Sequence, residues 1–239
     1  MDEPEGTWVS LFSGGKDSSF ALFLALERGL PVGRLITVHP RADSYMYHVP
    51  ATDLAPLAAE SIGIPILEID PGEFEEGVES GARGDAELEP LEARLRELDG
   101  ELAGGLGGIV AGAVESEYQT SRIEGMASRL GADLFAPLWR NDPSELAERM
   151  LEAGFEIVVV QVAADGLDES WLGRVLDREA FAELATLAKE RGVHLLGEGG
   201  EFETIVIDGP HMDRPIDLTY EREWDGIRGR LRITDARLA

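Results

Sequence analysis

The sequence predicts an α/β protein in which a parallel sheet with helices on both faces is followed by a smaller α+β domain. Short apolar segments alternate with longer segments of helical periodicity, as in sheets built from strand–helix–strand units. After about residue 137 this rhythm changes, and from Glu201 onward three strand-like segments follow one another. The 239 residues, of which 44% are hydrophobic, suffice for one large domain or two unequal ones.

The first domain is predicted to span residues 1–136. It opens with a buried strand at 7–12, a Ser-Gly-Gly turn and a helix at 16–28 that ends before Gly29. Further strands are predicted at 35–38, 64–69 and 109–113, and further helices at 52–62, 88–102 and 118–130. Right-handed crossovers then place the loops that follow the strands along one edge of the sheet, where ligands bind.

The second domain is predicted to span residues 137–239. A helix at 142–153 begins with Asp142 before a proline, and a buried strand at 157–162 and a helix at 181–191 follow. The segments FETIVID, PIDLTYEREW and IRGRLRIT predict antiparallel strands at the end of the chain. We expect the acidic stretches 73–79 and 85–92 to be solvated faces.

The charge is strongly negative, with 47 acidic and 21 basic residues and a net charge of −26. Such a surface repels nucleic acid unless a basic patch overrides it, so no nucleic-acid partner is expected. Lys16 and Lys189 are the two lysines, and all other basic residues are arginines. Abundant acid with scarce lysine resembles proteins of salt-loving archaea, in which molar salt shortens the Debye length to about 3 Å.

The composition also excludes several chemistries. Because the chain has no cysteine, it cannot form a disulfide, a thiolate zinc site, a cysteine nucleophile or a persulfide. No run approaches the roughly 18 apolar residues of a membrane span, and the acidic start is unlike a signal peptide. We therefore expect a cytoplasmic protein with no membrane association.

The turn after the first strand has the features of a phosphate site. Its residues are Ser13, Gly14, Gly15, Lys16, Asp17 and Ser18. Glycines allow close approach of the backbone, the first helical turn offers unpaired N–H groups, and Lys16 adds a positive charge. The string is not a Walker loop, because Ser10 and Asp17 stand where that motif requires Gly and Ser or Thr. An ordinary turn capped by Asp17 or Ser18 is the alternative.

A second unusual segment is EGGEFET, at residues 198–204. In an extended chain Glu201 and Glu203 would project to one face. Paired carboxylates can hold Mg²⁺, orient a nucleophile or attract a cation. A solvated strand edge in a very acidic protein is the alternative.

Four segments occur in a family's characteristic order: SGGKDS at 13–18, SYMYH at 44–48, ESEYQTSRIE at 115–124 and EGGEFET at 198–204. Together they resemble the diphthine–ammonia ligase family, and SGGKDS alone resembles the loop of the N-type ATP pyrophosphatases (PP-loop superfamily). The resemblance implies a Rossmann-like ATP-binding domain and a C-terminal domain for substrate recognition. It also implies ATP and Mg²⁺ as cofactors, with diphthine on translation elongation factor 2 adenylated and then amidated by ammonium.

The resemblance also implies the site residues. Lys16, Asp17, Glu201 and Glu203 are expected to be catalytic, with Asp17 holding the metal, and Gly112 is expected to join the phosphate loop around ATP. Substrate contacts are expected from Ser44, Tyr45, His48, Glu115, Tyr118, Gln119, Arg122, Glu198, Gly199, Gly200, Glu201, Glu203 and Thr204. Packing or an exposed helix start would explain the loop and helix residues equally well. Without cysteine there can be no cysteine-type glutamine amidotransferase, so ammonium is the natural nitrogen donor.

Two other functions stay open from the sequence. One is a different adenylating enzyme of the superfamily that acts on tRNA, against which the acidic surface and the missing cysteines count. The other is a non-catalytic module that binds ATP. The sequence also leaves open whether the chain acts as a homodimer.

Overall fold

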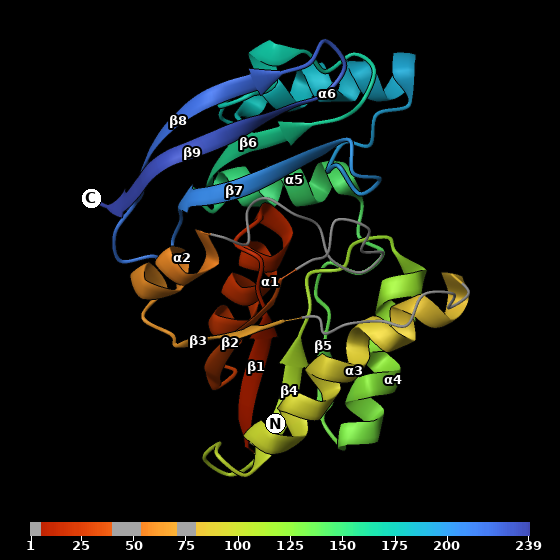
Figure 1. Ribbon diagram of the computed structural model, residues 1–239, viewed down its shortest axis with the longest axis vertical. Coiled ribbons are helices and arrows are strands. Elements are labelled where there is room, and N and C mark those ends of the chain that lie inside the picture. Colours follow the sequence, from red (N-terminus) through yellow and green to blue (C-terminus); the bar gives the residue numbers. More distant parts are fainter. Residues whose placement is uncertain (1–5, 40–53, 71–79) are drawn as a thin grey trace.

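The computed structural model describes residues 6–39, 54–70 and 80–239 (Figure 1). In this part of the chain the strands form two sheets. The first contains β1 (Thr7–Leu11), β2 (Val32–Val38), β3 (Ile66–Ile69), β4 (Leu106–Val110) and β5 (Asp133–Phe135) in the order β3-β2-β1-β4-β5. All its pairs are parallel, as the sequence predicts, although β5 was not expected.

Helices cover both faces of this sheet, because successive strand residues point to opposite sides. The helices are α1 (Lys16–Glu27), α2 (Ala55–Ile62), α3 (Ser80–Asp99) and α4 (Glu117–Leu130). Val9 and Ile109 face α3 and α4, whereas Trp8 and Val110 belong to the core that contains α1. The strand order reverses between β1 and β4, and ligands of such sheets bind beyond the carboxyl ends of the strands at this point.

The second sheet is antiparallel and smaller. It contains β6 (Glu156–Val162), β7 (Phe202–Asp208), β8 (Ile216–Trp224) and β9 (Gly229–Leu238) in the order β7-β6-β9-β8. Two helices, α5 (Pro143–Glu152) and α6 (Arg178–Arg191), and a 3-10 turn, η2 (Glu169–Trp171), complete this unit. The fold class predicted from the sequence is thus confirmed.

Helix α1 lies between the two sheets (Figure 1). Its Phe20 belongs to one apolar cluster with Phe155 and the β6 residues Ile157 and Val159, and the rings of Phe20 and Phe155 meet edge to face at 5.5 Å. Because this core is shared, the two sheets are held against one another by apolar burial. The shared core brings β7 next to the beginning of α1.

One acidic stretch departs from the expected solvated face. Glu92 in α3 is only 8% exposed, and its carboxylate accepts hydrogen bonds from Arg129 in α4 and from Arg96. These bonds, chiefly that from Arg129, hold the pKa of Glu92 below its ordinary value. Glu92 therefore ties α3 to α4, while the stretch 73–79 lies outside the described residues. Among the described helices, none is long and apolar enough to cross a membrane.

Candidate functional site

The turn between β1 and α1 has an open helix N-terminus. Gly15 is the N-cap residue in an extended conformation, and no side chain caps the helix. Gly14 has φ +80, a conformation that residues with a Cβ rarely adopt. The hydroxyls of Ser13 and Ser18 lie 3.1 Å apart, and Ser18 Oγ donates to the Gly15 carbonyl at 3.1 Å. The alternative of a turn capped by Asp17 or Ser18 does not describe this geometry.

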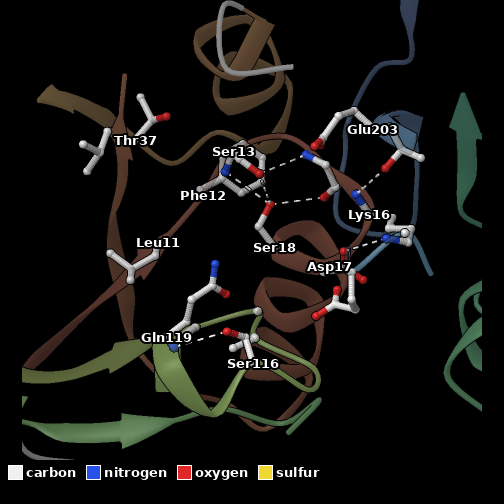
Figure 2. A pocket seen from close by; sticks show the side chains of 18 of the residues that line it. Leu11, Phe12, Ser13, Lys16, Asp17, Ser18, Thr37, Ser116, Gln119 and Glu203 are labelled. Carbon is white, nitrogen blue, oxygen red and sulfur yellow. Dashed lines mark hydrogen bonds and ion pairs between the residues drawn. The ribbon is translucent and has the colours of Figure 1, made fainter. Parts of the chain in front are cut away.

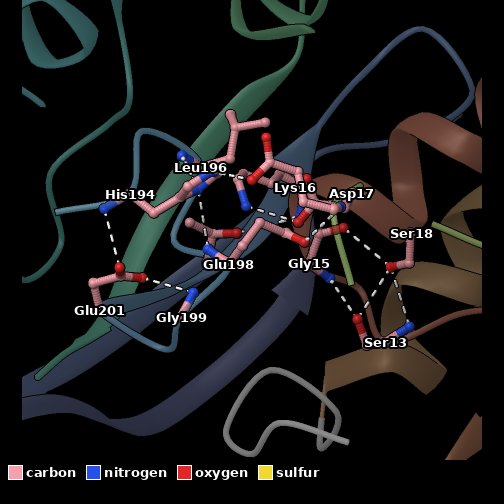
Figure 3. Close-up of polar contacts among 12 residues, drawn as sticks. Ser13, Gly15, Lys16, Asp17, Ser18, His194, Leu196, Glu198, Gly199 and Glu201 are labelled. Atoms are coloured by element: carbon pink, nitrogen blue, oxygen red, sulfur yellow. Dashed lines mark hydrogen bonds and ion pairs between the residues drawn. The ribbon is translucent and has the colours of Figure 1, made fainter. Parts of the chain in front are cut away.

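Lys16 and Asp17 form a partly buried ion pair at the start of α1 (Figure 3). Lys16 Nζ lies 2.7 Å from Asp17 Oδ2 and 5.6 Å from the centroid of the Phe202 ring. The other carboxylate oxygen of Asp17, Oδ1, is buried and has no hydrogen-bond partner among the described residues. The lysine charge is thus balanced, and one carboxylate oxygen is left to interact with a further group.

Strand β7, from the second sheet, completes the loop. The Lys16 amide donates to Thr204 Oγ1 at 3.2 Å, and the Val206 amide donates to the Gly14 carbonyl at 2.9 Å. We expected the amides of the first helical turn to be unpaired, and for Lys16 this is wrong because Thr204 is its acceptor. EGGEFET therefore belongs to the same site as SGGKDS.

A cavity of about 380 Å³ opens above this loop (Figure 2). Its walls come from the end of β1, the phosphate loop, β2, the loop after β4, α4 and EGGEFET. Gly112 lines it, and a Cβ at this position would lie 2.8 Å from the backbone of Asp17 and Ser18. Only glycine allows the loop after β4 to approach α1 this closely. The cavity lies where the strand order reverses.

The residues around the cavity include one that the sequence did not single out. Thr37 in β2 is 2% exposed, lines the cavity, and its Oγ1 has no hydrogen-bond partner within the described ranges. Its neighbours Ile36 and Val38 also line the cavity and give that wall an apolar character. Nothing in the sequence pattern distinguished Thr37 from an ordinary strand residue.

Glu198 is the titratable group most altered by this environment. Burial, and after it the charge of Asp17, raise the pKa of Glu198 to about 7, and the charge of Lys16 opposes this shift. The Glu198 carboxylate also accepts a hydrogen bond from the Glu115 amide at 3.4 Å. An acidic group that is half protonated near neutral pH therefore stands beside Asp17.

The two glutamates of EGGEFET do not share a face, contrary to expectation. Glu203 lines the first cavity, whereas Glu201 lines a second cavity on the other side of the loop. The oxygens of Glu201 accept from the His194 amide at 3.0 Å and from the Gly199 amide at 2.9 Å (Figure 3). The reason is that β7 begins at Phe202, so Glu201 belongs to the preceding turn rather than to the strand.

The other predicted site residues lie in different places. Gln119 and Gly199 line the first cavity, and Gly200 lies in the bend before β7. Tyr118 and Arg122 line neither of the two cavities, and the guanidinium of Arg122 stacks 3.6 Å from the centroid of the Tyr118 ring. Ser44, Tyr45 and His48 lie outside the described residues.

The described residues do not gather three or more Asp, Glu or His side chains into a metal site. A magnesium ion that arrives with a nucleotide needs only one or two protein carboxylates, since phosphate oxygens and water supply its other ligands. Asp17, with one buried oxygen that accepts no hydrogen bond from the described residues, fits that requirement.

Comparison with known proteins places the chain among enzymes of one kind. The family model described as "Diphthamide synthase N-terminal domain" matches residues 6–134, and "Diphthamide synthase C-terminal domain" matches residues 142–238. The zebrafish (Danio rerio) diphthine–ammonia ligase is 33% identical over 218 residues, which cover 87% of this chain and 84% of the relative. The human enzyme is 31% identical over 225 residues, covering 87% of this chain and 81% of its own length.

The Schizosaccharomyces pombe diphthine–ammonia ligase is 33% identical over 88% of this chain, but the match covers only 36% of that longer protein. A solved Methanocaldococcus jannaschii structure titled as a predicted subunit of tRNA methyltransferase aligns with 85% of this chain and 97% of its own, at 19% identity and a TM-score of 0.46. The family models and the relatives agree along almost the whole chain, so this protein belongs to the diphthamide synthase family, to which the diphthine–ammonia ligases belong.

Proposed function

We propose that this protein is a diphthine–ammonia ligase, which uses ATP to amidate diphthine on translation elongation factor 2. Family membership supports the reaction, and the observation that carries it in this chain is the direct contact between SGGKDS and EGGEFET. Lys16 N donates to Thr204 Oγ1, and Val206 N donates to the Gly14 carbonyl. The segment for the nucleotide and the segment for the acceptor therefore form one site.

The reaction has two steps. A carboxylate oxygen of diphthine attacks the α-phosphorus of ATP, and pyrophosphate leaves, so that an acyl-adenylate forms. Ammonia, formed when ammonium loses a proton, then attacks the acyl carbon, and AMP leaves with the bonding electrons. The products are the amide, AMP and pyrophosphate, and no oxidant or reductant is needed.

The phosphate loop is placed to hold the triphosphate. The serine hydroxyls, the amides of the first turn of α1 and Lys16 all lie at the N-terminus of that helix, where the dipole favours negative charge. These groups are already positioned, so they stabilise the charge that develops on the leaving pyrophosphate without reorganisation. We assign the wall formed by Ile36, Thr37 and Val38 to the base and sugar.

Asp17 would hold Mg²⁺ against the phosphates through its buried Oδ1. Bound there, the ion would neutralise phosphate charge and polarise the phosphoryl oxygens. Lys16 is the one lysine of the loop, and Asp17, Glu198 and Glu203 lie around it or line the same cavity. Because the triphosphate of ATP is itself negative, its binding here would need the additional positive charge of Mg²⁺.

In this proposal the parts of the chain that carry the two sheets have different roles. We assign ATP binding to residues 1–136 and recognition of the protein substrate to residues 137–239, with EGGEFET serving both. The acceptor is elongation factor 2 carrying diphthine, the nitrogen donor is ammonium, and the reaction takes place in the cytoplasm.

The test is release of AMP and pyrophosphate in the presence of ammonium, with and without elongation factor 2 that carries diphthine. Release that depends on the factor supports the amide ligase. Release that instead depends on tRNA would indicate another adenylating enzyme, and ATP binding with no release for any acceptor would indicate a non-catalytic module.

A further inference from the structure

A second cavity, of about 770 Å³ and more open, adjoins the nucleotide cavity. Ser116, Glu198 and Gly199 line both cavities and therefore form the wall between them. The remaining walls come from the beginning of α5, the end of α6 and the loop that follows α6. Apolar side chains supply much of this surface, namely Pro143, Ala185, Ala188, Val193 and Leu195.

Three carboxylates line this cavity, but two of them are already engaged. Both oxygens of Glu201 accept backbone N–H groups of the loop. Glu198 is half-buried, lies near Asp17 and Lys16, and accepts a hydrogen bond from the Glu115 amide. Glu115 is the third, and its side chain is 50% exposed. Because its backbone bonds to Glu198, Glu115 stands directly beside the wall that separates the two cavities.

His194 fixes the direction of the Glu115 carboxylate. The Nδ1 atom of His194 accepts hydrogen bonds from the amides of Leu196 at 3.1 Å and Glu198 at 3.3 Å (Figure 3). The ring proton is therefore on Nε2, which lies 3.2 Å from Glu115 Oε2 and donates to it. A histidine in this state orients the carboxylate without cancelling its negative charge.

An apolar cavity with one directed carboxylate suits a cation that carries methyl groups. A quaternary ammonium has no N–H to donate, so it is bound by charge and by contact with apolar surface. In diphthine the trimethylammonium group and the reacting carboxylate are on the same carbon atom. When the carboxylate of diphthine reaches the α-phosphate of ATP in the first cavity, the trimethylammonium group on the same carbon therefore lies beside the wall between the two cavities. Glu115 lies at this wall.

We propose that the second cavity seats the trimethylammonium group of diphthine, with Glu115 as its counter-charge and His194 as the residue that positions Glu115. This inference rests on the proposed function and adds to it the place where the acceptor is recognised. Lys189 also lines this cavity, with an exposed side chain, and has no role in this proposal.

The test uses a small probe that carries the reacting end of diphthine. Glycine betaine has a trimethylammonium group and a carboxylate on one carbon, and 3,3-dimethylbutanoate has the same shape without the positive charge. We expect glycine betaine to compete with diphthine-bearing elongation factor 2 about fivefold more strongly than 3,3-dimethylbutanoate, a ratio expected for a partly exposed ion pair. In Glu115→Gln this preference should disappear.

Steady-state kinetics of AMP release then separates the two substrates. Glu115→Gln should raise the KM for diphthine-bearing elongation factor 2 about fivefold and leave the KM for ATP unchanged. Glu117→Gln is the matched control, since Glu117 is exposed, lies two residues away and lines neither cavity. His194→Ala should raise the same KM in the wild-type background but not in Glu115→Gln, because coupled residues are not additive.

The outcomes distinguish failure of the proposed ligase function from failure of the proposed trimethylammonium site. If wild-type protein releases no AMP with the factor and ammonium, the proposed function itself fails. If release is normal but Glu115→Gln keeps the wild-type KM for the factor and the wild-type preference for glycine betaine, the cation site is overturned. A change confined to the KM for ammonium would also overturn it, by assigning Glu115 to the nitrogen donor.

Discussion

The hydrogen bond between the Lys16 amide and Thr204 Oγ1 can be tested by removing one hydroxyl. Thr204 is 4% exposed, so Thr204→Val keeps the shape of the side chain and leaves a buried N–H without its acceptor. An unsatisfied buried donor costs about 1–3 kcal/mol, and the greater apolarity of valine offsets part of this. We expect the free energy of unfolding to fall by about 1–2 kcal/mol.

For a chain of this length each kcal/mol corresponds to about 2–4 °C in the melting temperature, so the expected loss is about 2–8 °C. Bound nucleotide should reduce this loss of melting temperature, because a phosphate oxygen can accept a hydrogen bond from the Lys16 amide in place of the Thr204 hydroxyl. Thermal unfolding with and without a non-hydrolysable ATP analogue measures both quantities.

Thr204→Ser is the control for packing. It keeps the hydroxyl and loses one buried methyl group, worth about 1 kcal/mol, and this loss should be the same with and without nucleotide. The reasoning is refuted if Thr204→Val unfolds at the wild-type temperature. It is also refuted if the deficit of Thr204→Val is as large with nucleotide as without it, since the amide would then not face the phosphates.

Three further predictions follow from the charges. Lys16→Ala should lower turnover in the AMP-release assay at least ~100-fold, the loss typical of one electrostatic donor, and wild-type turnover would contradict the proposed role. His211 packs on Phe155 with ring centroids 5.2 Å apart, and burial lowers its pKa to about 4. The unfolded chain, with a histidine pKa of about 6.5, then binds the proton more readily, so stability is full above about pH 6.5 and falls by about 3 kcal/mol as the pH drops towards 4. His211→Phe should remove that part of the acid sensitivity in unfolding titrations, and identical pH profiles would exclude it. Because the net charge is −26, the melting temperature should rise between about 0.1 M and molar KCl, where the Debye length shortens from about 10 Å to about 3 Å, and a flat dependence would show that self-repulsion does not limit stability.

Several features of this protein are determined by the sequence locally. The alternation of apolar strands with periodic helices indicated the parallel sheet, and the glycines after β1 indicated a helix that begins at Lys16 without a side-chain cap from its own N-cap residue. These signals are local, because strand and helix periodicity and the conformational freedom of glycine act within a few residues. For the same reason the motif SGGKDS could be placed at a ligand edge before any tertiary contact was known.

The tertiary structure decided which of these groups meet. The bond between the Lys16 amide and Thr204 joins residues 188 positions apart, and it exists because the shared apolar core packs α1 against β7. Glu201 and Glu203 have the spacing of neighbours on one face, yet the start of β7 at Phe202 separates them into different cavities. Whether a carboxylate or an amide faces a ligand depends on the packing of distant elements, and no periodicity in the chain encodes that packing.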